Sequence, residues 1–598
     1  MANILSFINR GKTRISYNFI GLTLALTLGA GISGARDMKA VTHPDLGPNV
    51  LIFDPKMPSA AIQEKIDKIY AIEQHSEFGP ERFAVLFLPG EYHVNVPVGF
   101  YTQVLGLGVT PDAVHISGDV HSDADEKTNN ATTTFWRAVE GLSVTPAGNT
   151  MKWAVSQAAP FRRMHVRGNL VLHQHHGWAS GGWMSDAVVD GNIDSGTQQQ
   201  WIARNSEWGS WTGSNWNMVF VGVKSPPRGE WPDPPYTKVD EVPISREKPF
   251  LQVDEKGNWS VRVASLQKKS VGITWHGGST PGKSIPLDQF YIAHPGDSSA
   301  RINAQLSQGK NLLLTPGIYD LTEPIQVTRP DTVVLGLGFA TLRPIKGTAA
   351  MTVADAGGVD VAGLLFDAGP EVSPVLLEVG SDATKTRHAE NPTVLHDVFF
   401  RVGGAGAGRT QVNLRINSND VIVDHTWIWR ADHGDGVGWT SNASANGLVV
   451  NGNDVTVYGL FVEHHQEFQV LWNGNGGRTY FYQSEIPYDP PDQPSYTSAK
   501  GTNGWASYKV SDSVTTHEAW GLGIYSVFEQ PNVVLSRAIE VPKKPAVRFH
   551  HIITVALGDL GEISNVIDDA GGATRIKPRV TPKVMDFPSM STDSPSTN

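Results

Sequence analysis

Two glutamates in the second half of the chain are the residues best suited to acid and base chemistry. Glu463 closes the run VTVYGLFVE, and Glu485 closes the run TYFYQSE 22 residues later. If the runs are neighbouring strands about 4.8 Å apart, the two carboxyl groups are within reach and cannot both ionise freely. One of them then keeps its proton near neutral pH, as protonation of a glycosidic oxygen requires. The alternative is a solvent-exposed ladder of acidic side chains.

The residues around this pair favour a cleft over a ladder. Aromatic, acidic and histidine side chains are concentrated in the same stretches, and glycines separate them. They are Trp429, Asp432, His433, Asp435, Trp439, His464, His465, Trp472, Tyr482 and Tyr488.

The first half of the chain contains a polar pair with similar spacing. Gln157 in WAVSQA and Ser180 in WASGGW are 23 residues apart, and Gln200 and Trp201 follow. Eight of the 17 tryptophans lie between residues 136 and 216. Any single tryptophan is expected to fill core, but flat indole faces also stack on sugar rings. The cluster therefore predicts a carbohydrate groove.

Composition excludes several other chemistries. The chain has no cysteine, so thiolate zinc sites and thiol catalysis are absent. We find neither an HExxH pattern nor a G-x-S-x-G elbow, and we expect no metal and no cofactor. With 59 acidic against 48 basic residues, a net charge of −11 and no Lys/Arg-rich block, a nucleic acid partner is not expected.

An approximate internal duplication organises the chain. Ile62, Ile66 and Ile69 at helical spacing precede VLFLPGEY and QVLGLG, and Ile302 and Leu306 precede LLLTPGIY and TVVLGLG. Each copy predicts a short helix, a buried strand, a Pro-Gly turn and a second strand. We therefore expect two homologous domains.

The short β-branched and aromatic runs that follow predict a parallel β-solenoid. In the second half they begin at residues 359, 393, 421, 455 and 479, so their starts are 34, 28, 34 and 24 residues apart. That spacing is typical of one solenoid coil, whereas antiparallel hairpins have shorter intervals and two-residue turns. The predicted fold is all-β, with two tandem right-handed parallel β-helices (β-solenoids) and short capping helices. A β-sandwich or propeller is the alternative.

The domain prediction follows from these patterns. We expect a signal peptide at 1–35, since three basic residues precede an apolar run of about 14 residues, shorter than a membrane span; an uncleaved signal anchor is the alternative. The N-terminal β-helix is predicted at 41–224, a linker or wrapping segment at 225–263, the C-terminal β-helix at 264–587, and a disordered tail at 588–598. The mature protein is expected to be secreted or periplasmic, free of the membrane after signal cleavage, and monomeric.

Several longer motifs resemble glycoside hydrolase family 55. In chain order they are WAVSQA, SGGWMSD, SGTQQQW, WNMVFVG, WIWRADHGDGVGW, VEHHQEFQVLWNGNGGRTYFYQSEIPYD and HEAWGLGIYSVF. The resemblance covers roughly residues 49–571 and implies an inverting exo-β-1,3-glucanase of the laminarinase type, a glucan exo-1,3-β-glucosidase that releases glucose from β-1,3-glucan. It also implies an active site in the cleft between two β-helices.

The resemblance also implies roles for individual residues. Glu485 matches the general acid of the family and Glu463 its neighbouring essential carboxylate. Gln157 and Ser180 match the pair that holds the nucleophilic water. The residues expected to contact substrate are Trp429, Asp432, Tyr488, Trp439, Trp472, Gln200 and Trp201.

Two other functions remain as alternatives. A β-helix polysaccharide lyase, or a hydrolase of acidic glycans, would need a Lys/Arg-rich groove for uronates, often with Ca²⁺, whereas the expected cleft is acidic and aromatic. A non-catalytic glycan-binding β-helix would leave the pairing of Glu463 with Glu485 unexplained.

Overall fold

The computed structural model describes residues 43–381, 386–498 and 501–589. The predicted signal peptide at 1–35 and residues 590–598 of the predicted tail lie outside this part of the chain. None of the helices in the described part is long and apolar enough to cross a membrane.

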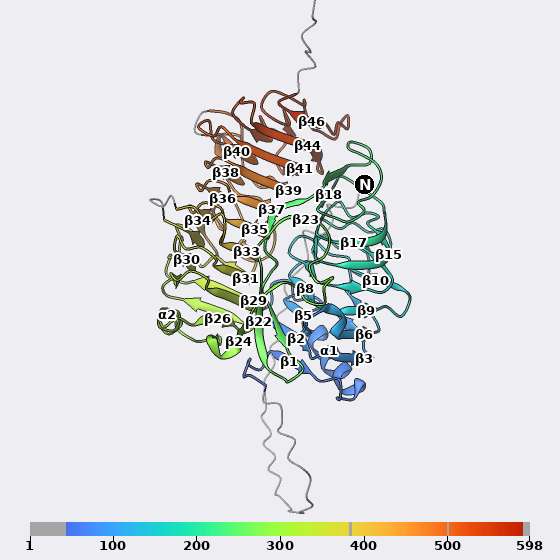
Figure 1. The fold of residues 1–598 in the computed structure, drawn as a ribbon. Helices are drawn as coiled ribbons and strands as arrows, with labels where there is room; N and C mark the ends of the chain where they lie inside the picture. The colour runs from blue at the N-terminus through green and yellow to red at the C-terminus, as the bar shows by residue number, and fades with distance from the viewer. Residues whose placement is uncertain (1–42, 382–385, 499–500, 590–598) are drawn as a thin grey trace, which may run out of the picture. The chain divides into compact units, whose positions relative to one another are not determined.

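Two parallel β-helices make up the fold, as the sequence predicts (Figure 1). In the N-terminal β-helix, successive coils contribute one strand each to a nine-stranded sheet. Its order is β1 (Val50–Phe53), β2 (Phe83–Phe87), β5 (Thr102–Gly106), β8 (Arg137–Glu140), β11 (Pro160–Arg162), β14 (Trp183–Ser185), β16 (Gln200–Arg204), β18 (Asn217–Val221) and β19 (Tyr236–Val239). The second sheet contains β3 (Gly90–Tyr92), β6 (Val114–Ser117), β9 (Ser143–Thr145), β12 (His165–Val166), β15 (Val188–Asp194), β13 (Asn169–Val171), β10 (Thr150–Lys152) and β17 (Glu207–Thr212).

The C-terminal β-helix repeats the plan with longer strands. Its main sheet contains β25 (Phe290–Ala293), β26 (Asn311–Leu314), β29 (Val333–Pro344), β31 (Asp360–Asp367), β33 (Val394–Val402), β35 (Ile422–Arg430), β37 (Thr456–Glu463), β39 (Gly477–Glu485), β41 (His517–Ser526), β44 (Val547–Ala556) and β46 (Lys583–Phe587), with β27 (Ile318–Leu321) beside β29. The second sheet contains β28 (Ile325–Val327), β30 (Met351–Val353), β32 (Leu377–Val379), β34 (Thr410–Ile416), β36 (Ser444–Val450), β38 (Val470–Trp472), β40 (Tyr508–Val510) and β43 (Ile539–Glu540).

Two pairs of short strands complete the coils. They are β4 (Val96–Pro97) with β7 (Val120–His121), and β42 (Val534–Leu535) with β45 (Glu562–Ile563). Single turns of 3₁₀ helix occur at η1 (Pro111–Ala113), η2 (Leu287–Gln289) and η3 (Pro494–Tyr496).

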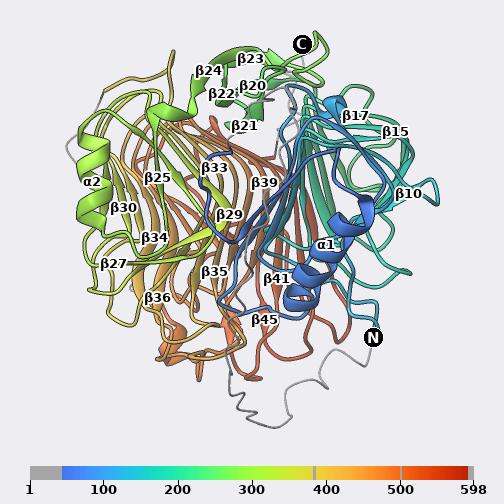
Figure 2. The same ribbon diagram turned by 90° about the horizontal axis from the view of Figure 1, so that it is seen from below.

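A short helix lies at the start of each β-helix, where the sequence predicts a cap. Helix α1 (Ser59–Glu73) buries Ile62, Ile66 and Ile69, and α2 (Ser299–Ser307) buries Ile302 and Leu306. Both helices lie at the same end of the two stacks, as Figure 2 shows from below. They cover apolar ends that would otherwise be open to edge pairing.

The segment predicted as a linker at 225–263 is built of strands. Its first strand, β19, extends the N-terminal sheet by pairing with β18. The remainder forms antiparallel pairs that continue beyond residue 263, so the predicted boundary falls inside a strand: β20 (Val242–Ser245) with β23 (Gln267–Ser270), and β21 (Phe250–Val253) with β22 (Trp259–Ala264) and β24 (Gly282–Pro286). Apolar residues of this segment, including Leu251 and Val261, share a core with Leu105 and Leu335 of the two β-helices. Burial of these side chains explains why the segment is ordered.

A column of left-handed residues bends the long strands of the C-terminal β-helix. Asp397, His425 and Phe481 have φ of 47°, 75° and 69°, and Gly363, Gly459 and Gly521 occupy the same position in other coils. The ladder skips each of them, as between His396 and Val398 of β33. An extra residue with positive φ bends a strand as a β-bulge does. The bend turns Asp397 and His425 toward the N-terminal β-helix.

Aromatic and ionic contacts join the two β-helices. Trp136 packs against Trp427 at a ring-centroid distance of 4.7 Å. Arg162 of β11 binds both Asp397 and Asp424 at 2.8 Å, and all three side chains are buried. Although burial opposes it, the charges of Arg162 and Lys248 hold the pKa of Asp397 well below its usual range. The two stacks therefore pack together through a buried aromatic and ionic interface.

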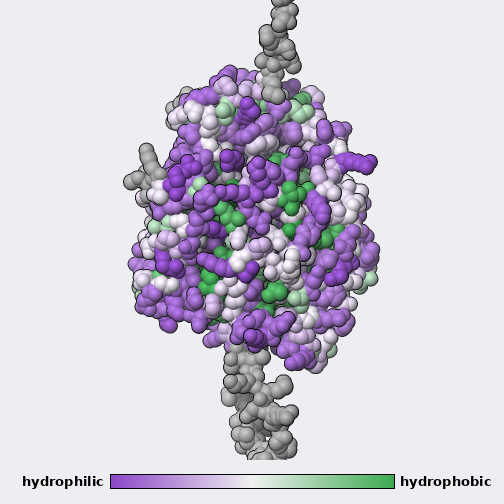
Figure 3. Space-filling model, in the orientation of Figure 1, coloured by the Kyte–Doolittle hydropathy of each residue, from purple (hydrophilic) through white to green (hydrophobic). Residues whose placement is uncertain are grey.

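One face of the molecule, shown in Figure 3, is largely hydrophilic with small separate apolar patches. An extended apolar patch would mark a partner surface.

Candidate active site

Glu463 and Glu485 lie side by side at the ends of adjacent strands, as the spacing predicts. Glu463 of β37 is in register with Glu485 of β39. The same column continues to Trp429 of β35 on one side and to Tyr525 of β41 on the other. Successive residues of such a column are about 4.8 Å apart. The column therefore places two carboxyl groups between two aromatic side chains.

Glu463 is held by three donors. Gln157 Nε2 and Gln483 Nε2 donate to Oε1 at 3.0 and 2.7 Å, and Trp427 Nε1 donates to Oε2 at 2.8 Å. The residue is only 3% exposed, and this burial raises its pKa to about 7 against the effect of the hydrogen bonds. Because all three partners are N–H donors, they favour the ionised carboxylate.

Glu485 has fewer hydrogen-bond donors than Glu463. It is partly buried, and the hydroxyl of Tyr488 donates to its Oε2. Burial, followed by the negative charges of Glu463 and Asp432, raises its pKa well above the usual range. Two neighbouring carboxyl groups with opposed environments divide into an acid and an anion. Glu485 is therefore the member that keeps its proton.

Gln157 and Ser180 come from the N-terminal β-helix and meet this pair. Gln157 Nε2 lies 3.2 Å from Ser180 Oγ, and the same nitrogen reaches Glu463 across the interface. His425 Nε2 lies 3.1 Å from the backbone oxygen of Gln157, whose φ is 34°. A non-glycine residue in this region of φ is uncommon and is concentrated at functional sites.

The side-chain oxygen of Gln157 is placed to accept a hydrogen bond from a small polar ligand. Gln157 Oε1 is buried and accepts no hydrogen bond within the described residues. A buried oxygen of this kind costs free energy unless a ligand or water satisfies it. Ser180 Oγ lies 3.2 Å from Nε2 of the same amide group, so Gln157 Oε1 and Ser180 Oγ can hold one water molecule.

Asp432 and Tyr488 also lie at the pair, as predicted. His433 Nδ1 is 3.0 Å from Asp432 Oδ1, and His464 packs edge-on against Tyr488 at 4.4 Å. Burial raises the pKa of Asp432, but the hydrogen bond to His433 and the charge of His464 outweigh it and lower this pKa below its usual value. The Asp432 side chain is 28% exposed. Asp432 is thus an anion open to ligand.

Three of the tryptophans predicted to contact sugar are buried, which corrects the prediction. Trp201 and Trp472 are completely buried in the cores of the two β-helices. Trp429 is 1% exposed, and Phe78 and Trp427 cover its two faces at 6.1 and 4.8 Å. Trp201 and Trp472 point into the β-helix cores, whereas Trp429 lies on the same side of its strand as Glu463 and is covered at the interface between the two β-helices. A sugar therefore has no open face of these rings to stack upon.

The two remaining residues predicted to contact substrate are Trp439, which is only partly buried, and Gln200, which is buried and hydrogen-bonds the backbone of Ser180. Trp439 is partly buried, with the guanidinium of Arg430 5.6 Å from its ring centroid. Gln200 is 1% exposed and donates to the backbone oxygen of Ser180 at 3.3 Å. Gln200 therefore supports the loop that carries Ser180.

The tryptophan cluster at residues 136–216 is mostly core, so the groove prediction was wrong for most of its members. The buried ones are Trp136, Trp153, Trp183, Trp201, Trp208 and Trp211. Trp178 is 36% exposed and stacks on Trp216 at 6.2 Å, and Trp216 contacts Tyr525 at 5.2 Å. Only this short aromatic series extends outward beside Glu485.

Sequence reasoning missed Trp427, Gln483 and His425 as supports of the site. Trp427 and Gln483 lie two residues before Trp429 and Glu485 on the same strands. Strand alternation places residues i and i+2 on one face, so that signal was present. His425 had no such signal, because it lies at a bend.

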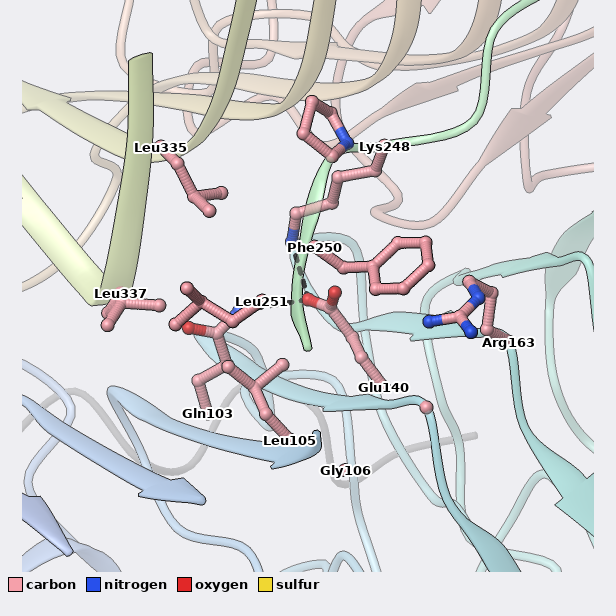
Figure 4. A pocket seen from close by; sticks show the side chains of 12 residues that line it. Gln103, Leu105, Gly106, Glu140, Arg163, Lys248, Phe250, Leu251, Leu335 and Leu337 are labelled. Carbon is pink, nitrogen blue, oxygen red and sulfur yellow. Dashed lines mark hydrogen bonds and ion pairs between the residues drawn. The ribbon is translucent and has the colours of Figure 1, made fainter. Parts of the chain in front are cut away.

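Other candidate sites are less suited to chemistry. Within the described residues, no group of three or more His, Asp or Glu side chains is arranged to hold a metal ion. A pocket between the β-helices is lined by Gln103, Glu140 and Lys248 together with leucines (Figure 4). Lys248 Nζ pairs with Glu140 at 2.5 Å, and Gln103 also donates to Glu140. This pocket contains no predicted site residue, and its polar groups join the two stacks.

Fold and site together define a β-helix glycoside hydrolase, with two adjacent carboxyl groups in different hydrogen-bonding surroundings at the junction of two stacks. A family model described as the LAM55 pectate lyase-like domain matches residues 290–485. An exo-beta-1,3-glucanase from Streptomyces sp. (strain SirexAA-E / ActE) is 46% identical over 569 residues, covering 95% of this chain and 93% of that protein.

Two solved structures of a family relative also match this chain. The structure of sacteLam55A from Streptomyces sp. SirexAA-E matches with a TM-score of 0.89 and 47% identity, covering 91% of this chain and 99% of that one. A glutamate-to-alanine variant of sacteLam55A in complex with glucose matches equally well. The chain belongs to glycoside hydrolase family 55, which confirms the resemblance found in the sequence.

Proposed function

We propose that this protein is an exo-β-1,3-glucanase that releases glucose from the non-reducing end of β-1,3-glucan with inversion of the anomeric centre. The observation that carries the proposal is the pairing of a proton-retaining Glu485 with the triply hydrogen-bonded Glu463. The relative named exo-beta-1,3-glucanase and the glucose complex support the substrate class.

The proposed reaction begins with proton transfer. Glu485 donates its proton to the glycosidic oxygen as the C–O bond breaks, and the aglycone leaves as an alcohol. The sugar acquires oxocarbenium character, which the negative charges of Glu463 and Asp432 stabilise. Glu463 is a poor nucleophile because donors occupy both of its oxygens. Its role is electrostatic.

Water completes the proposed reaction. A water molecule bound by Gln157 Oε1 and Ser180 Oγ attacks the opposite face of the sugar ring and then loses a proton to solvent. Glu485 is reprotonated from solvent. Neutral groups suffice for holding water because attack on an oxocarbenium-like centre needs little prior deprotonation.

The anomer released tests inversion directly. A proton NMR time course on laminarin should show α-glucose first, followed by mutarotation. Early β-glucose would refute inversion, whereas release of larger oligosaccharides would refute exo action. A panel of other glucans in the same assay defines the linkage, and ultraviolet-absorbing products from pectin or alginate would favour the lyase alternative.

The cellular location and assembly are part of the proposal. The basic and apolar pattern within residues 1–35 supports secretion or a periplasmic location. All of the proposed site residues come from one chain, which supports a monomer.

Trp178 should contribute to binding on the leaving-group side. The general acid lies nearest the leaving group, and Trp216 and Trp178 extend outward from Tyr525 beside Glu485. In Trp178→Ala, we expect KM for oligosaccharides of three or more glucoses to rise about tenfold, the effect of one lost aromatic contact. Laminaribiose should be affected less. Trp178→Phe is the control and should restore most of the affinity, whereas equal KM changes for short and long substrates would contradict this placement.

A further inference from the structure

A loop of the N-terminal β-helix reaches the substrate-facing residues of the C-terminal β-helix. The loop follows α1 and carries Glu77 and Phe78. Glu77 Oε1 lies 2.6 Å from His433 Nε2, and Phe78 stacks on Trp429 with an interplanar angle of 9°. Glu77 and Phe78 therefore contact His433 and Trp429, which lie on either side of Asp432 in the chain.

These contacts belong to a continuous series that ends at the general acid. His433 Nδ1 is 3.0 Å from Asp432 Oδ1, and the same oxygen is 3.9 Å from His464 Nε2. His464 packs against Tyr488, whose hydroxyl donates to Glu485. Glu77 is thus linked to the reacting carboxyl group through four side chains.

The loop that carries Glu77 is itself anchored, so Glu77 can hold His433 in place. Tyr101 donates to the backbone oxygen of Glu77 at 2.6 Å, and Arg401 donates to the hydroxyl of Tyr101 at 2.6 Å. Arg82 Nη1 binds the backbone oxygen of Gly79 at 2.8 Å. Buried groups from both β-helices therefore fix the backbone of the loop that carries Glu77.

His433 lies between two carboxylates, which favours its cationic form. The charged groups facing it are Glu77 from the loop after α1 and Asp432 from its own turn, and the rings of Phe78 and Trp429 pack against one part of a side chain that is 40% exposed. Burial lowers the pKa of His433, but hydrogen bonds to both carboxylates outweigh it and raise this pKa to about 10. Both ring nitrogens then donate, and Asp432 is held as an oriented anion.

We propose that Glu77 is a positioning residue for the hydrolytic reaction, which acts through His433 to orient the carboxylate of Asp432 beside Glu463 and Glu485. The proposal rests on the proposed function, because Asp432 is assigned there to stabilise positive charge on the sugar. It assigns to the N-terminal β-helix an electrostatic role in addition to holding the water.

Glu77→Gln tests the proposal because it removes the charge and retains the size. We expect kcat/KM on laminarin to fall about tenfold, with most of the loss in kcat, since Asp432 is proposed to act mainly on the charged transition state. Asp586→Asn is the matched control. Asp586 lies on β46, the last strand of the main C-terminal sheet and three strands from the one that bears Glu485. The substitution removes a 2.6 Å carboxylate contact to His550 and should leave kcat/KM unchanged.

A histidine titration separates positioning from simple stabilisation. In NMR of ¹³C-histidine-labelled protein, with the His433 signal assigned from His433→Gln, the wild-type ring should stay protonated past pH 8. In Glu77→Gln, we expect its pKa to fall by about one to three units, as for loss of one adjacent opposite charge. An unchanged His433 titration would overturn the proposed link, whether or not laminarin is the substrate.

A double-mutant cycle tests whether the effect of Glu77 on kcat depends on His433. If Glu77 acts through His433, the double variant Glu77→Gln, His433→Gln should be no more than about twofold slower than His433→Gln alone. Fully additive losses, or unchanged kcat in Glu77→Gln with a shifted His433 titration, would overturn the proposal. If the wild-type enzyme releases no glucose from laminarin, the proposed function fails, and the titration still decides the contact.

Discussion

Glu485→Gln should lower kcat on laminarin by about 10²–10⁴-fold, the range expected for loss of a general acid. The amide has the same size and cannot supply a proton to the glycosidic oxygen. Aryl glucosides with an acidic phenol as leaving group need little protonation, so their hydrolysis should fall much less. This difference between substrates is the expected signature of the role assigned to Glu485.

The measurement compares both substrates in the variant and in a matched control. Glu518 lies on β41 opposite Arg478, at the other end of the strands that bear Glu485 and Tyr525. Glu518→Gln removes a carboxylate from the same sheet and should retain wild-type kcat. Thermal unfolding confirms that both variants are folded. Unchanged laminarin hydrolysis in folded Glu485→Gln would remove Glu485 from the mechanism.

Much of the fold could be predicted because a solenoid repeats itself in the sequence. Strand starts near one coil length apart indicated the stack, and the duplicated helix and Pro-Gly turn indicated two domains. Glu463 and Glu485 end their strands at equivalent points, so parallel register was enough to bring them together. The strand periodicity was therefore sufficient to predict that Glu463 and Glu485 lie together.

Contacts between the two stacks could not be derived from spacing. Gln157 meets Glu463 across 306 residues, and this pairing was implied only by the family resemblance. The direction of Trp201 and Trp472 was misjudged because a tryptophan count does not distinguish inward from outward positions. His425 was missed because residues with positive φ interrupt strand alternation at each bend. Glu77 was missed because it lies in a loop far from the carboxylate pair in sequence.

Glu463→Gln should reduce kcat on laminarin by about 10²-fold or more and move the alkaline limb of the pH profile to lower pH. The negative charge of Glu463 raises the pKa of Glu485, after the larger effect of burial. Without that charge the pKa of Glu485 falls, so Glu485 loses its catalytic proton at a lower pH. The amide also places an NH₂ group against N–H donors, and this mismatch should cost about 1–3 kcal/mol of folding stability.

The direction of the pH shift tests the electrostatic coupling between the two carboxyl groups. Loss of the charge of Glu463 lowers the pKa of Glu485 and so moves the alkaline limb to lower pH. Profiles of kcat over pH 4–9 for wild type and Glu463→Gln, measured below the unfolding temperature of both, provide the comparison. An alkaline limb that is unchanged or moves to higher pH would contradict the electrostatic coupling, because Glu485 would then titrate independently of its neighbour. Since interacting carboxyl groups titrate as a pair, the test is the displacement between the two profiles and not either midpoint alone.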